Sequence, residues 1–193
     1  QLPKDESMWL GPMTPYAASK LAAEGYVQAY AAAYGVPTTL LRFFNVFGPS
    51  QRPDHEYAAV IPKWVASFLN KEDVFINGDG ETSRDFCYVK NAVQMNLLAD
   101  TTNNAKAIDQ IYNVALNDRT TLNELYKIIE DRLINKVQGL ENKKPKYRQF
   151  RSGDVRHSQA SIDKAQKLLG YHPKFRISEG MDQAIDWYIK STS

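Results

Sequence analysis

The chain has little cysteine, no strong excess of charge and no long apolar run. Cys87 is the single cysteine among 193 residues, so no disulfide can form within the chain. Lys and Arg total 24 against 22 Asp and Glu, and the formal net charge of +2 gives no general reason to bind nucleic acid or an anionic membrane. We also find neither an apolar run of membrane-spanning length nor a secretory leader, and therefore predict a cytoplasmic protein with no nucleic-acid or membrane partner.

A second absence concerns the pattern of glycines. The 10 glycines never form G-x-G-x-x-G, the pattern in which a tight turn places a dinucleotide pyrophosphate at a helix N-terminus. The chain also begins at Gln1, in the polar segment QLPKDES, rather than at a methionine. We therefore expect a cut within a longer protein, whose phosphate loop for a dinucleotide lies upstream.

The segments that are present alternate between strand and helix. Thr14 and Pro15 form a capped entry to an Ala-rich helix that should run to about Tyr34, where Gly35 suits a helix end. Residues 45–49 are expected to be a loop. Further strands are predicted at 37–44, 73–76 and 110–115, further helices at about 59–69, 89–100, 121–137, 161–169 and 178–189, and a basic linker at 143–148. This alternation predicts an α/β fold.

Tyr16 and Lys20 lie four residues apart, on one face of the first predicted helix. A tyrosine hydroxyl becomes a useful base near neutral pH only when a nearby cation stabilises its phenolate, and a lysine supplies that cation. The pair therefore suggests part of a redox enzyme. The alternative is an ordinary solvated edge of an amphipathic helix.

Histidine and cysteine give no candidate site. His55, His157 and His172 do not stand at the spacing of metal ligands, so we predict no metal site. We interpret Cys87 as a small buried hydrophobic residue, because no motif pairs it with a histidine base.

Five motifs in this order, YAASK, LRFFNVFGPSQRP, YAAVIPKW, NGDGETSRDFCYV and RSGDVRHS, resemble those of the extended short-chain dehydrogenase/reductases that act on nucleotide sugars. The chain is most similar to UDP-N-acetylglucosamine 4-epimerases of bacterial surface-polysaccharide pathways. The resemblance implies the last part of a Rossmann-like, doubly wound NAD-binding domain, at residues 1–48 and about 85–118. It also implies a small α/β nucleotide-sugar-binding domain, at about 49–84 and 119–193. NAD would be held mainly by the upstream half, and the whole protein would be a homodimer.

The resemblance also implies roles for residues at the redox centre. Tyr16 would remove the proton from the sugar 4-hydroxyl while hydride passes to NAD, and Lys20 would hold the nicotinamide ribose. Phe43 and Val46 match positions that line the nicotinamide, although an aromatic residue and a valine at a strand end are otherwise core residues. The Ser or Thr that orients the sugar in this family should stand about twenty residues before the tyrosine, upstream of this chain.

The remaining implied residues would contact the UDP-sugar. Their assignments are as follows: Asn45 at the diphosphate region, Val60, Phe75 and Asn77 at the uridine, Arg84 and Arg151 on the diphosphate, Asp154 on the ribose hydroxyls, and Ala59 and Ser158 as small side chains that leave space for an N-acetyl group. Guanidinium donors match diphosphate oxygens, and apolar surface with a few hydrogen bonds suits a flat base. Asn45, Asn77 and Asp154 could each instead be turn residues.

The sequence thus predicts a portion of an NAD-dependent UDP-N-acetylhexosamine 4-epimerase that would be inactive in isolation. A UDP-hexuronate epimerase or a nucleotide-sugar dehydratase is the nearest alternative. An acidic residue at the upstream Ser or Thr position would indicate the dehydratase. A non-catalytic module that binds nucleotide sugars is the alternative of another class.

Overall fold

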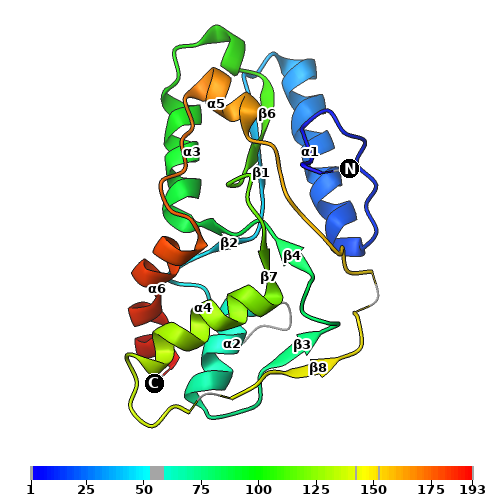
Figure 1. The fold of residues 1–193 in the computed structure, drawn as a ribbon. Helices are drawn as coiled ribbons and strands as arrows, with labels where there is room; N and C mark the ends of the chain where they lie inside the picture. The colour runs from blue at the N-terminus through cyan, green and yellow to red at the C-terminus, as the bar shows by residue number, and fades with distance from the viewer. Residues whose placement is uncertain (1, 53–58, 142, 152, 193) are drawn as a thin grey trace.

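A computed structural model describes residues 2–52, 59–141, 143–151 and 153–192 of the chain. One half of the molecule is built on two parallel strands, β1 (Thr39–Phe43) and β6 (Gln110–Val114), with Leu41 opposite Tyr112. Helices α3 (Val89–Thr101) and α5 (Asp163–Leu169) cover one side of this pair, and α1 (Pro15–Tyr34) lies on the other (Figure 1). The predicted α/β class is confirmed.

The bounds of α1 are those predicted from its capping residues. Thr14 is extended and its Oγ1 accepts a hydrogen bond from Ala17 N at 3.2 Å, while Gly35 ends the helix in the left-handed conformation with φ 65°. None of the α1 residues is buried, and the helix is held to β1 by an ion pair between Glu24 and Arg42 at 2.6 Å.

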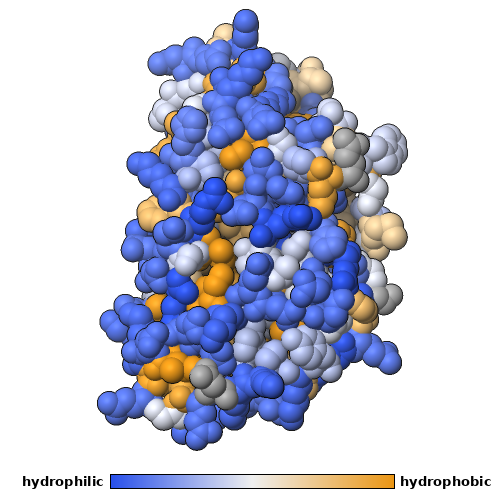
Figure 2. All heavy atoms as spheres, viewed as in Figure 1, coloured by the Kyte–Doolittle hydropathy of each residue, from blue (hydrophilic) through white to orange (hydrophobic). Residues whose placement is uncertain are grey.

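The surface is mostly polar on the face shown in Figure 2, where apolar side chains appear in separate small groups. Within the described part of the chain, no helix is both long enough and apolar enough to cross a membrane.

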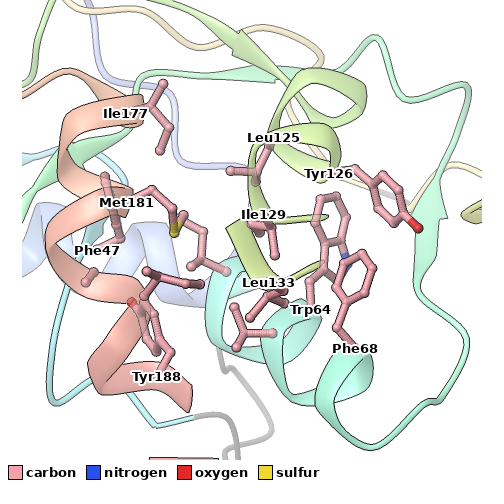
Figure 3. Close-up of a cluster of buried hydrophobic side chains, with 14 of the residues drawn as sticks. Phe47, Trp64, Phe68, Leu125, Tyr126, Ile129, Leu133, Ile177, Met181 and Tyr188 are labelled. Atoms are coloured by element: carbon pink, nitrogen blue, oxygen red, sulfur yellow. The ribbon is translucent and has the colours of Figure 1, made fainter. Parts of the chain in front are cut away.

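The other half of the molecule is a packed group of helices α2 (Val60–Leu69), α4 (Leu122–Ile134) and α6 (Ile177–Thr192). Figure 3 shows their side chains meeting in one apolar cluster. Aromatic side chains fill much of it, with the rings of Trp64 and Tyr126 6.2 Å apart and edge-on. This core fixes the position of α2, which forms one wall of the pocket described below.

Short strand pairs link segments that are distant in sequence (Figure 1). They are β2 (Val46–Phe47) with β5 (Cys87–Tyr88), β4 (Ser83–Arg84) with β7 (Thr120–Thr121), and β3 (Phe75–Asn77) with β8 (Lys146–Arg148). Two predictions were wrong here, because the expected loop at 45–49 contains β2 and the expected basic linker contains β8. The lysine and arginine of β8 are compatible with a strand because both are exposed, and within the described part of the chain β8 pairs with β3 alone.

A second hydrophobic cluster lies between β6, α3 and α5. It contains Met95 and Tyr112, and also Ala160, Ala165 and Tyr171, all fully buried. Residues 160–171 thus pack against the parallel strands, although the division made from the sequence assigns them to the substrate-binding part. That division stays a prediction.

Candidate nucleotide-sugar site

A pocket with a volume of about 300 Å³ lies between α2, β3, β4 and the loops that follow β1 and β8. It brings together nine of the residues singled out in the sequence: Asn45, Val46, Ala59, Val60, Phe75, Asn77, Arg84, Arg151 and Asp154. These residues come from segments up to about a hundred positions apart, and the three-helix core and the short strand pairs hold those segments in place.

Among the described residues, the charged lining of this pocket consists of three cationic side chains and one carboxylate, namely Lys63, Arg84, Arg151 and Asp154. Arg84 Nη2 donates to the Asp154 carboxylate, and Arg84 Nη1 donates to Ser83 O at 2.9 Å. Within the described residues, the guanidinium of Arg151 has no hydrogen-bond or ion-pair partner. The excess of positive charge, with one preoriented guanidinium, suits an anion that carries several oxygen atoms.

Apolar surface lines another part of the same pocket. Val60 and Trp64 come from α2, and Trp64 Nε1 donates to Phe75 O at 3.3 Å, which ties α2 to β3. The guanidinium carbon of Arg148 lies 3.3 Å from the centre of the Phe75 ring. With the amide of Asn77 beside it, this wall offers flat apolar area and a directional hydrogen-bonding group, as a planar ring requires.

The turn after β3 requires a glycine at position 78. Gly78 has φ 79°, and a Cβ atom there would lie 2.1 Å from Cε1 of Phe150. A side chain at this position would therefore push the ring of Phe150 away, and Phe150 belongs to the segment that leads to Arg151.

Tyr16 and Lys20 lie in the first two turns of α1. Both are exposed, and Lys20 Nζ is 5.3 Å from the centre of the Tyr16 ring. They do not line the pocket. The start of α1 nevertheless adjoins the loop that carries Arg151 and Asp154, because a Cβ atom at Gly153 would lie 3.9 Å from Thr14 Cγ2.

Comparison with known proteins gives the same family as the motifs. A model described as the NAD dependent epimerase/dehydratase family matches residues 1–115. The chain belongs to this epimerase/dehydratase family.

Individual relatives agree with that assignment. The chain is 33% identical to a UDP-glucuronate 4-epimerase of Thermodesulfobacterium geofontis, over 91% of this chain and 50% of that protein. Among solved structures, it resembles a UDP-N-acetylglucosamine 4-epimerase from Methanobrevibacter ruminantium M1 in complex with UDP-N-acetylmuramic acid (TM-score 0.88, 37% identity, 98% of this chain and 58% of that chain). It also resembles the UDP-glucose 4-epimerase of Thermotoga maritima with UDP-glucose (TM-score 0.87, 34% identity, covering 99% of this chain and 58% of that chain). The chain spans about half the length of the curated relatives it matches, 57% and 50% of the first two.

Besides Tyr16 and Lys20, two further predicted residues, Phe43 and Ser158, lie outside the pocket lining. Phe43 ends β1 and is 52% exposed, two positions before Asn45. Ser158 is half-buried, and its N–H donates to Ser83 O at 3.0 Å, so it lies beside the strand that carries Arg84.

Some pocket residues of this chain were not predicted from its sequence. Lys63 and Trp64 stand three and four positions after Val60, so helical spacing alone would have placed them on the same face of α2. Thr82 and Leu122 had no such signal, because they are forty positions apart and are brought together by a backbone hydrogen bond from Leu122 N to Thr82 O at 3.0 Å.

Two buried groups near β5 differ in their ionisation. Burial raises the pKa of the Cys87 thiol to about 12, so this thiol is not a reactive thiolate at neutral pH. Burial also raises the pKa of Asp85 to about 6, although hydrogen bonds from the backbone of Leu116, Ala160 and Asp118 act in the opposite direction. Asp85 is therefore mostly ionised at neutral pH while fully buried.

Proposed function

We propose that this chain supplies the nucleotide-sugar pocket and the catalytic base of an NAD-dependent UDP-N-acetylhexosamine 4-epimerase. The observation that carries the proposal is the convergence of nine predicted positions on one pocket with a cationic part and an apolar part. In a UDP-sugar the diphosphate is anionic and the uracil ring is flat, so one ligand would use both parts.

The pocket would hold the UDP portion and leave the sugar free to turn. Arg84 and Arg151 would bind the diphosphate oxygens, and Asp154 would accept hydrogen bonds from the ribose hydroxyls. Val60, Phe75 and the other uridine positions lie on the apolar wall. Because every anchor is on the nucleotide, the sugar ring can present either face while UDP stays bound.

Tyr16 would act at the sugar 4-hydroxyl, taking its proton onto Oη. Lys20, one helical turn away, would stabilise the deprotonated Tyr16 hydroxyl that accepts this proton. Both side chains are exposed on α1 beside the Arg151 loop, so a ligand anchored in the pocket would extend towards them.

The residues that would meet NAD fit the nicotinamide end of that cofactor. Lys20 offers an ammonium donor for ribose hydroxyls, and Phe43 exposes an aromatic face at the carboxyl end of β1, where ligands collect in doubly wound sheets. NAD, when bound, would accept hydride from the sugar C4 and return it to the other face of the ring. The positions that would hold its pyrophosphate are not among the motifs of this chain.

The acetamido preference rests on Ala59, which is half-buried in the pocket lining, and on Ser158 near Arg84. Small side chains there leave space beside the sugar. A UDP-hexuronate epimerase remains the alternative, together with a dehydratase or a binding module.

Two measurements test the proposal. First, calorimetric titration of UDP into this chain should show binding without NAD, because the residues assigned to the UDP portion all belong to the chain. Second, the protein that contains this chain, supplied with NAD, should convert UDP-N-acetylglucosamine to its 4-epimer, whereas the 193-residue chain alone should not. UDP binding without any conversion by the longer protein would favour the binding module. Conversion of UDP-glucuronate alone, or loss of water from the sugar, would favour the other two enzymes.

A further inference from the structure

Asp85 is fully buried in the short connection between β4 and β5, next in sequence to Arg84. Arg84 lines the pocket, whereas the carboxylate of Asp85 lies in the interior. A buried carboxylate is unfavourable unless hydrogen-bond donors surround it, so its partners indicate its role.

The partners of Asp85 are three backbone N–H groups from two other loops. Oδ1 accepts from Leu116 N at 2.9 Å, and Oδ2 accepts from Ala160 N at 3.2 Å and Asp118 N at 3.3 Å. Leu116 and Asp118 belong to the connection between β6 and β7, and Ala160 follows Ser158 by two positions. One side chain thus joins three segments that are distant in sequence.

Each joined segment carries or adjoins part of the pocket. β4 carries Arg84, and its partner strand β7 leads directly to Leu122 on the pocket wall (Figure 1). The segment before Ala160 runs alongside β4, with Ser83 N donating to Arg156 O and Ser158 N donating to Ser83 O, both at 3.0 Å. The same segment begins at the Arg151–Asp154 loop.

We propose that Asp85 is a positioning residue for the nucleotide-sugar pocket. It fixes β4 against the β6–β7 connection and the segment before Ala160, so that Arg84 and the Arg151 loop converge on one diphosphate. The proposal rests on the proposed function, and Asp85 itself contacts no ligand. Without the carboxylate, three N–H groups lose their acceptor, and the two loops can shift relative to Arg84.

Titration of UDP and of uridine into the 193-residue chain tests this role. Asp85→Asn should weaken UDP roughly tenfold and Asp85→Ala more, while uridine, which lacks the diphosphate, weakens by about twofold at most. Asp118→Asn is the matched control, because it removes a carboxylate from the same loop, is 40% exposed there and leaves the N–H bond to Asp85 intact. Partial unfolding would weaken both ligands by the same factor, so an unchanged ratio of the two affinities in the Asp85 variants overturns the proposal.

Amide hydrogen exchange separates this role from the proposed function. In Asp85→Asn, residues 114–119 and 156–161 should exchange faster than in the wild type, with helices α4 and α6 unchanged. If the wild type binds neither UDP nor uridine, the proposed function is wrong, and faster exchange confined to the two loops still supports the positioning role. Unchanged exchange in both loops overturns that role whatever the UDP affinity.

Discussion

Replacement of each pocket arginine by methionine gives the most direct test of the diphosphate assignment. Methionine keeps an apolar stem of similar length and removes the charge. Arg151 has no side-chain partner within the described residues, whereas Arg84 donates to Asp154 and to the backbone of Ser83. The two variants should therefore weaken UDP in the same direction but by different amounts.

The magnitude follows from these contacts. Loss of a charge-assisted hydrogen bond weakens binding by about 1.5–3 kcal/mol, which is roughly 10- to 150-fold. Arg151→Met should fall in this range and leave the free energy of unfolding within about 0.5 kcal/mol, since the exposed Arg151 side chain has no hydrogen bond or ion pair with the described residues. Arg84→Met should weaken UDP more, because the Asp154 carboxylate then faces the diphosphate without its cation. Its loss of stability should be about 0–1 kcal/mol, because Asp154 is 41% exposed.

The assay is calorimetric titration of UDP at one fixed ionic strength, because salt screens exposed charges, with a thermal melt of each variant. Arg176→Met serves as the control, since Arg176 is 69% exposed and pairs with Asp118 outside the pocket. Unchanged UDP affinity in both pocket variants would refute the diphosphate assignment. An equal loss in the control would show a general charge effect instead.

Four further predictions concern the base, the pH dependence, the core and the surface of α1. In the protein that contains this chain, Tyr16→Phe should lower turnover of UDP-N-acetylglucosamine roughly 10²- to 10⁴-fold with little change in substrate affinity, and near-normal turnover would contradict its role as base. The pKa of Asp85 is raised from 3.8 to about 6, so Asp85 should contribute about 3 kcal/mol of stability that is complete below about pH 4 and is lost as the pH rises through 6. Urea unfolding of Asp85→Asn between pH 4 and 8 should lack this decline. Leu133→Ala should lower the free energy of unfolding by about 2–5 kcal/mol, since Leu133 is fully buried in the three-helix core, and a loss below 1 kcal/mol would contradict that packing. Tyr30, which is 60% exposed on α1, should lie in a homodimer contact. The wild-type protein that contains this chain should therefore sediment as a dimer at micromolar concentration, and its Tyr30→Glu variant as a monomer. A monomeric wild type would contradict this prediction.

The sequence by itself determined the long elements, because their signals are local. Thr14, Pro15 and Gly35 set both ends of α1 through capping and backbone conformation, and Thr121 sets the start of α4 by a reciprocal capping bond with Glu124. The apolar patterns of the remaining helices and of strands β1 and β6 were also sufficient. The five motifs identified the family for the same reason, since they can be recognised without knowledge of the fold.

Only the tertiary structure decided the short strands and what they bring together. Two-residue strands such as β4 and β7 have no periodicity to detect, and the basic segment at β8 becomes a strand only because β3 lies beside it. The pairing of Arg84 with Asp154, the inclusion of Lys63 in the pocket and the three backbone bonds to Asp85 all join residues that are distant along the chain. Such contacts depend on how helices and loops pack in three dimensions, which no local pattern of residues encodes.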